Sequence, residues 1–239
     1  MNRPFEVYDV KDIIALRRVL FAIELLDAVT LNRVSHGMKE VKAHGLQGKP
    51  IVNTSGLFVW LDEDIEQLQK ISIDPGVLPY EETERNRAQL NLDHDSTQRI
   101  WPLTTIELPP RVDYPFSTGI TGLRGTLVEA PHEDPPRPVP GAEVYVRWLD
   151  QDGNWHDAPT RSHTTASSAT TPGGDFVAIL RFARSDDPEL DATGNLTVRL
   201  RVKRGEDERR SGDLKVPQGR VASPSTPDQF VFAWDELEP

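Results

Sequence analysis

Cysteine is absent from this chain of 239 residues, and its absence excludes several kinds of chemistry. Disulfide frameworks, cysteine zinc sites, iron–sulfur clusters and thiol nucleophiles all need cysteine side chains. A surplus of positive charge is also lacking, because 27 Lys and Arg stand against 38 Asp and Glu, a formal net charge of −11. Sequence-blind binding to nucleic acid and docking on anionic membranes both need such a surplus. We therefore expect no nucleic-acid partner and no membrane-surface docking.

Long apolar runs are lacking as well. No stretch approaches the roughly 18 apolar residues of a membrane helix, so membrane insertion is not expected. Charged residues such as Asp9, Arg17 and Glu24 interrupt the N-terminal segment, which therefore does not match a standard secretory signal. The expected location is the cytoplasm at synthesis, and later incorporation into a released or virion-like particle is left open.

Most of the chain has apolar residues at every second position, which is typical of half-buried strands. This alternation is clearest in residues 21–25, 57–61, 144–148, 196–202 and 230–234. Helical spacing is sparse, with short candidate helices at 62–71 and 81–90. The sequence therefore predicts a mainly β protein built from antiparallel sheets, with few short helices.

The chain is expected to contain two related modules. Each half has the same order of parts: a strand, a small turn, a second strand, a longer excursion, and a strand in which glycine precedes an aromatic residue. A segment with several prolines and glycines separates the halves. We predict an N-terminal arm (1–18), a first β-sandwich (19–108), a joint (109–122) and a second β-sandwich (123–239). Tyr114 and Phe116 offer the joint a means of packing against either module.

Three short motifs follow one another in the second half, LRGTLV at 123–128, PVPGAEV at 138–144 and GGDF at 173–176. Glycines suit the turns, and Ala142 is small enough for close packing of the sheets. This order resembles the transthyretin-like, carboxypeptidase-regulatory type of β-sandwich, and the first half resembles it more weakly. The resemblance implies a fold that mostly carries binding or structural roles. Tandem modules of this kind look like accessory components of phage-tail-like or contractile-injection assemblies.

No recognised catalytic or metal-binding motif is present. The six histidines form no H-E-x-x-H pattern, and Ser162-His163 lies in no G-x-S-x-G elbow. The Asp-Gln-Asp-Gly-Asn run at 150–154 resembles the start of a calcium loop, but Arg161 stands where that loop has a bidentate glutamate. A hairpin turn is the favoured interpretation. We expect no enzyme activity, no metal and no cofactor.

Two segments are candidates for binding a protein partner. A basic stripe occurs in the C-terminal half and comprises Arg199, Arg201, Lys203, Arg204, Arg209, Arg210, Lys215 and Arg220. It is either a solvated strand and hairpin or a surface that docks on acidic residues, such as 61–95 of another copy. The N-terminal arm either covers its own module or adds a strand to a neighbour's sheet edge, and an initial helix at 9–20 competes with an extended arm. The partner-binding candidates are Phe5, Val7, Tyr8, Ile13, Arg199, Arg201, Lys203 and Arg204.

These observations favour a non-enzymatic structural or adaptor component of a larger protein assembly, with copies of itself among its partners. An alternative is a module that binds carbohydrate or another small ligand, in which Trp101 or Trp155 stacks on a sugar face.

Overall fold

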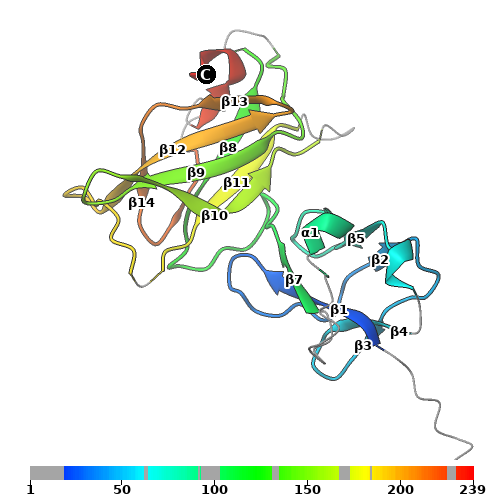
Figure 1. Ribbon diagram of the computed structural model, residues 1–239. Coiled ribbons are helices and arrows are strands. Elements are labelled where there is room, and N and C mark those ends of the chain that lie inside the picture. The colour runs from blue at the N-terminus through cyan, green and yellow to red at the C-terminus, as the bar shows by residue number, and fades with distance from the viewer. Residues whose placement is uncertain are drawn as a thin grey trace, which may run out of the picture.

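The computed structural model describes residues 19–61, 64–90, 92, 103–130, 135–166, 173–183, 185–224 and 230–239. Within these ranges the chain is mainly β, with one short α-helix and short 3₁₀ helices. Figure 1 shows two bodies of strands, and β7 leads from the first body toward β8 in the second. The mainly β fold of sandwich type with few helices is confirmed.

The first module consists of two sheets that share one core. The first sheet has the order β3-β4-β1-β7, with strands β1 (Val19–Asp27), β3 (Ile51–Val52), β4 (Phe58–Leu61) and β7 (Leu103–Leu108). The second has the order β2-β5-β6, with strands β2 (Glu40–His44), β5 (Lys70–Asp74) and β6 (Thr83–Asn86). Side chains from both sheets fill the core, among them Phe21, Ile23, Trp60, Ile71 and Leu108.

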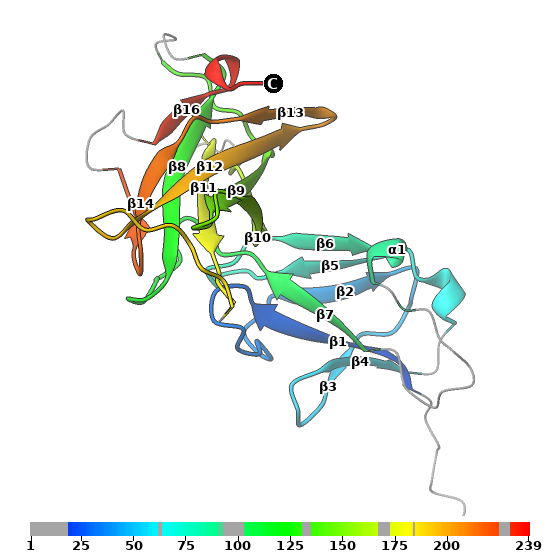
Figure 2. The same ribbon diagram turned by 60° about the vertical axis from the view of Figure 1, so that its left-hand side comes forward.

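The second module also has two sheets around a separate core. One joins β9 (Glu143–Leu149), β10 (Trp155–His163), β12 (Asn195–Arg204), β13 (Asp207–Arg210) and β14 (Leu214–Pro217). The other joins β8 (Thr121–Val128), β11 (Asp175–Leu180), β15 (Val221–Ala222) and β16 (Val231–Ala233). Figure 2 shows the two sheets of this module beside the first module. The alternating residues of β9 and β12 point inward as expected, since Val144, Leu196, Val198, Leu200 and Val202 are fully buried.

The two modules repeat one pairing pattern around their first strands. β1 pairs antiparallel with β4 and parallel with β7, while β8 pairs antiparallel with β11 and parallel with β16. β4 and β11 carry the aromatic residues that follow glycine, Phe58 and Phe176, and both side chains are buried. The order of parts repeated in the sequence thus corresponds to repeated strand pairing.

The parallel pairs are a departure from the expected all-antiparallel sheets. β7, β15 and β16 each run parallel to a first strand, whereas the other pairs between the strands described are antiparallel. Alternation indicates which side chains face the core, but it carries no information on the direction of the neighbouring strand.

Both predicted helices proved wrong over most of their length. In the described part of 62–71, which starts at 64, the 3₁₀ helix η2 (Ile65–Gln67) is followed by the start of β5. Residues 81–90 contain strand β6 followed by the short helix α1 (Arg87–Leu90). Ile71 and Ile73 are buried on alternate positions of β5, which pairs with both β2 and β6. Burial with period two therefore outweighs the helical spacing in this region.

The strand at 57–61 turns its aromatic residues inward. Phe58 and Trp60 are buried, while Leu57, Val59 and Leu61 are half-buried. At the C-terminus, β16 is followed by the 3₁₀ helix η3 (Trp234–Glu236). In the part of the chain that the structure describes, no helix has the length and apolar character needed to cross a membrane.

Candidate functional site

A buried carboxylate ties the end of β1 to the joint. Asp27 is only 5% exposed, and its Oδ2 accepts hydrogen bonds from the hydroxyls of Tyr80 (3.2 Å) and Tyr114 (2.5 Å). Its Oδ1 accepts from the backbone N–H groups of Val29 (2.7 Å) and Thr30 (3.2 Å). Buried charges are tolerated when hydrogen bonds satisfy them in this way. The Asp27 latch, defined here as Asp27 with Tyr80 and Tyr114, thereby fixes the joint on the first module.

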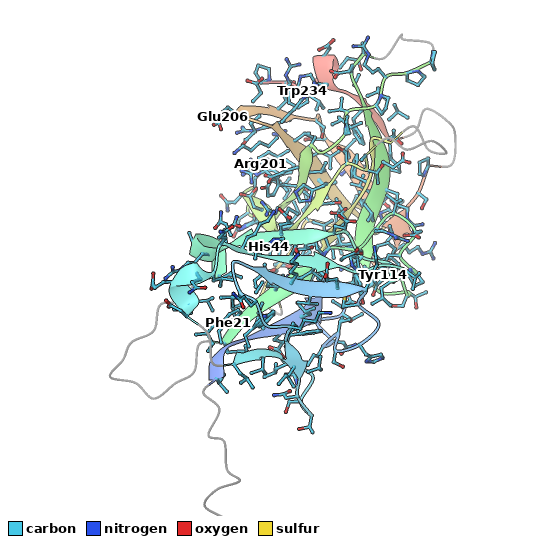
Figure 3. All side chains as sticks on the ribbon, turned by 90° about the vertical axis from the view of Figure 1, so that its right-hand side faces the viewer. Phe21, His44, Tyr114, Arg201, Glu206 and Trp234 are labelled. Carbon is cyan, nitrogen blue, oxygen red and sulfur yellow. The ribbon has the colours of Figure 1, made fainter. Side chains whose placement is uncertain are left out.

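The joint also contacts the second module. Tyr114 stacks at a tilt against Phe116, with ring centroids 4.8 Å apart, and both residues pack on the first core. Arg124 of β8 donates a hydrogen bond from Nη2 to the carbonyl oxygen of Tyr114 (2.9 Å) and lies over the Phe116 ring. Figure 3 places Tyr114 close to the boundary between the modules. The joint is therefore bonded to both modules through Tyr114.

Stability is expected to fall as the pH rises above about 10. Burial, reinforced by the Asp27 charge, raises the pKa of Tyr80 to about 12, and burial also raises the pKa of Tyr114. Because the folded pKa values exceed the unfolded value, their contribution is complete below about pH 10 and is lost as the pH passes through the folded values. Urea unfolding at about pH 8 to 12 would measure the loss, at about 1.4 kcal/mol per pKa unit for each tyrosine. The double variant Tyr80→Phe and Tyr114→Phe should show a flatter profile, and a parallel decline would contradict this origin.

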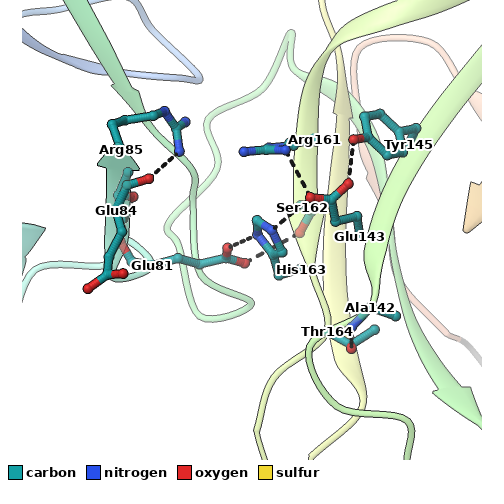
Figure 4. Close-up of polar contacts among 11 residues, drawn as sticks. Glu81, Glu84, Arg85, Ala142, Glu143, Tyr145, Arg161, Ser162, His163 and Thr164 are labelled. Carbon is teal, nitrogen blue, oxygen red and sulfur yellow. Dashed lines mark hydrogen bonds and ion pairs between the residues drawn. The ribbon is translucent and has the colours of Figure 1, made fainter. Parts of the chain in front are cut away.

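A polar network connects the two modules on another side (Figure 4). Glu81, which precedes β6, contacts β10 of the second module, where its carboxylate meets Ser162 Oγ at 3.4 Å and His163 Nδ1 at 3.3 Å. Glu143 of β9 accepts hydrogen bonds from Arg161 Nη1 (2.9 Å) and from the Tyr145 hydroxyl (2.7 Å). Residues far apart in the sequence thus form one hydrogen-bonded surface between the modules.

The contact of Ser162 and His163 with one carboxylate was not evident from the sequence. Adjacent residues of a strand point to opposite faces, and Ser162 is buried whereas His163 is partly exposed. Both side chains interact with Glu81. A catalytic serine of the triad type is hydrogen-bonded to a histidine imidazole. Ser162 and His163 each contact Glu81 and make no such hydrogen bond with one another in the described part of the chain.

A cavity of about 370 Å³ lies beside this network, with both modules contributing to its wall. Arg85 of β6, Arg161 of β10 and Arg181, which follows β11, line the cavity together with Glu107 of β7. Arg181 Nη2 donates to Glu107 Oε2 at 2.8 Å across the module boundary. In Figure 4 the guanidinium groups of Arg85 and Arg161 face one another. We call this space the arginine cavity.

A neighbouring cavity of about 650 Å³ shares Glu107, Pro159 and Arg181 with the arginine cavity. Its wall includes Trp148, whose ring stacks on His156 with centroids 4.6 Å apart. This wall is mainly apolar and aromatic where it meets the second core.

The run at 150–154 forms the turn between β9 and β10, as expected. Asp150 Oδ1 accepts from the Asn154 backbone N–H (2.7 Å), and Oδ2 contacts His156 Nε2 at 2.7 Å. The hydrogen bond with His156 is the main reason that the pKa of Asp150 falls to about 2. Within the described ranges, no group of three or more histidine and carboxylate side chains is placed to hold a metal ion.

Four residues of the predicted basic stripe lie on β12 and engage partners within the chain. Arg199 Nε bonds Asp213 Oδ1 at 2.6 Å, and its guanidinium lies over the Trp155 ring. Arg201 lies over the Tyr145 ring. The other two stripe residues on β12 have acidic neighbours, since Lys203 stands opposite Glu143 in the sheet register and Arg204 bonds Glu129 at 2.9 Å. An acidic partner would therefore compete with internal contacts, and the role of this stripe stays a prediction.

The other predicted partner-binding residues, Phe5, Val7, Tyr8 and Ile13, lie outside the described residues, as do most of the possible helix at 9–20 and the candidate sugar platform Trp101. Trp155 has one ring face covered by the Arg199 guanidinium, 4.3 Å from the ring centroid. That face is therefore not open for stacking on a sugar.

Sequence reasoning missed the residues that meet between the modules. Arg85, Arg161 and Arg181 are separated by many residues and belong to no local motif. Comparison with known proteins adds no assignment, because no family model, curated protein or solved structure matches the chain.

Proposed function

We propose that this protein is a non-enzymatic structural or adaptor component of a larger assembly, of the kind found in phage-tail-like or contractile-injection particles. In this proposal its modules are transthyretin-like sandwiches. The observation that carries it is the apolar edge strand β3, where Ile51 is 52% and Val52 is 47% exposed. Edge strands usually are very short or bear charge or proline, which limits pairing with other chains; β3 has two residues, and neither is charged or proline. An apolar edge instead favours the addition of a strand.

The bonding between the modules supports an adaptor role. Polar contacts cross the boundary from Arg181 to Glu107, from His163 and Ser162 to Glu81, and from Arg124 to the joint. An adaptor transmits position between its partners only if its own modules keep a fixed relation. These contacts supply that relation without a long flexible linker.

The proposed occupant of the β3 edge is the N-terminal arm of a second copy. The arm has apolar residues at alternate or nearby positions, including Phe5, Val7 and Tyr8. Such a segment supplies main-chain hydrogen bonds to the free edge and side chains to the apolar surface beside it. The partner is thus defined by chemistry as an extended apolar strand.

The mass of the full chain in solution tests this proposal. We expect masses that are multiples of 26.8 kDa in light scattering and native mass spectrometry. Val52→Lys places a charge on the edge and should raise the concentration needed for half-assembly by about tenfold or more, equivalent to about 1.4 kcal/mol. Removal of residues 1–18 should have the same effect.

The matched control is Val77→Lys, because Val77 is 94% exposed in the turn that follows β5. Assembly of this variant should equal that of the unmodified protein. A monomer at every concentration would contradict the proposal. Loss of assembly in Val52→Lys with full retention after removal of 1–18 would exclude the arm as the occupant of the edge.

A further inference from the structure

The arginine cavity contains more positive than negative charge on its wall. Three arginines line it and Glu107 is the carboxylate among the lining residues described. Glu107 pairs with Arg181, while Arg161 is neutralised from outside the wall by Glu143 at 2.9 Å. This distribution is unexpected in a chain with a net charge of −11. The surplus positive charge is therefore a local feature of the place where the modules meet.

Arg85 has no carboxylate partner among the described residues. Its Nη1 donates to the main-chain carbonyl of Glu84 at 2.9 Å, whereas the Glu84 carboxylate bonds Lys70 Nζ at 2.7 Å. Burial, followed by repulsion from the Arg161 charge, lowers the pKa of Arg85. Burying a guanidinium beside another cation costs free energy of folding unless a nearby anion balances the charge.

Arg181, on the same wall, has a hydrogen-bond donor without an acceptor among the described residues. Arg181 Nη2 is bonded to Glu107, but its Nη1 is buried and has no hydrogen-bond partner in the part of the chain that the structure describes. A buried donor without an acceptor costs about 1–3 kcal/mol. Among the described residues, Arg85 lacks a counter-ion and Arg181 Nη1 lacks an acceptor. One anionic group bound between them would supply both.

The dimensions of the cavity restrict the kind of ligand. Its volume of about 370 Å³ is within the usual range for small-molecule sites and too small for a folded segment of a partner. Gln89 and Thr105 add neutral polar groups to the wall, and Tyr145 adds an aromatic ring. Guanidinium groups bind carboxylate and phosphate oxygens through paired, charge-assisted hydrogen bonds.

We propose that the arginine cavity binds a small molecule that carries an oxyanion, either a carboxylate or a phosphate, held by Arg85, Arg161 and Arg181. The ligand bridges the modules, because Arg85 belongs to the first and the other two arginines to the second. Its binding therefore stabilises their relative position. This inference does not depend on the proposed assembly role.

The test uses inorganic phosphate and succinate as probes of the full chain at about pH 7. Each is titrated in a calorimeter and in thermal unfolding, with chloride at equal ionic strength as the reference. We expect saturable binding of at least one probe and a rise in the unfolding temperature that follows its saturation. No saturable binding of either probe would overturn the proposal.

Two variants should change the affinity in opposite directions. Arg85→Gln should weaken binding of the effective probe by about tenfold or more. Without ligand this variant should be as stable as the parent or more so, because repulsion from Arg161 is removed. Glu107→Gln should tighten binding, since it removes the one carboxylate on the described wall and frees Arg181.

Arg210→Gln is the matched control, because Arg210 is exposed on β13 and does not line the cavity. Its affinity should equal that of the parent. Equal weakening in Arg85→Gln and Arg210→Gln would show a general charge effect and overturn the proposal. Unchanged or weaker binding in Glu107→Gln would overturn it as well, even if Arg85→Gln fails to fold.

Discussion

Replacing Asp27 with alanine is expected to lower the free energy of unfolding by about 3–5 kcal/mol, the range for removing one partner from a buried charged network. The carboxylate accepts four hydrogen bonds, from the Tyr80 and Tyr114 hydroxyls and from two backbone N–H groups. Alanine leaves all four donors without this acceptor in a place where Asp27 itself is only 5% exposed. Each buried donor without a partner carries its own desolvation cost.

Urea unfolding monitored by circular dichroism at pH 7 measures this loss. Asp27→Asn keeps one carbonyl oxygen and should lose less, about 1–3 kcal/mol. Asp152→Ala is the control, because Asp152 is exposed in the β9–β10 turn, and its effect should stay within about 0.5 kcal/mol. A loss below about 1 kcal/mol in Asp27→Ala would show that the latch contributes little to stability.

The Asp27 latch also contributes to the link between the two modules. Tyr114 bonds Asp27 through its side chain and Arg124 through its carbonyl oxygen, so one residue links β1 to β8. Loss of the side-chain bond removes one link between the joint and the first module. The backbone hydrogen bonds from Glu81 N–H to the Pro109 oxygen (2.9 Å) and from Arg111 N–H to the Pro79 oxygen (3.0 Å) remain. The contacts from Glu81 and Glu107 are further polar links across the boundary.

The sequence predicted which face of each strand points inward better than it predicted which strands pair with one another. Over 21–25 in β1, 144–148 in β9 and 196–202 in β12, every second residue is apolar and buried, because the side-chain period of a strand is a local property. A helix was wrongly predicted at 62–71 because Ile65, Leu68 and Ile71 also fit a helical spacing. Pairing of β5 with strands on both sides decided between the two periods, and such pairing is not local.

Local sequence patterns could not predict the candidate site. Asp27 and Tyr114 are 87 positions apart, and Glu81 and His163 are 82 apart. No spacing rule connects residues that meet only after two modules pack. The acidic residues at 61–95 and the basic stripe suggested complementary charge between copies. The residues of the second module that meet Glu81 and Glu107 are instead His163 and Arg181, which do not belong to the stripe.

A second large effect is expected in the first core, at Trp60. Its side chain is 1% exposed and stacks on Phe21 with ring centroids 4.7 Å apart and an interplanar angle of 11°. Trp60→Ala removes this stack and leaves a cavity between the two sheets. The free energy of unfolding should therefore fall by about 3–5 kcal/mol in urea unfolding.

Trp60→Phe separates packing from hydrogen bonding at the same position. The Trp60 Nε1 is buried and has no partner among the described residues, so phenylalanine removes an unsatisfied donor while it keeps a ring against Phe21. Relief of the donor, worth about 1–3 kcal/mol, offsets part of the lost volume. We expect a net loss below about 1.5 kcal/mol, far less than for alanine. Equal losses in the two variants would mean that the indole N–H is bonded in solution and that a ring kept against Phe21 does not compensate for the lost volume.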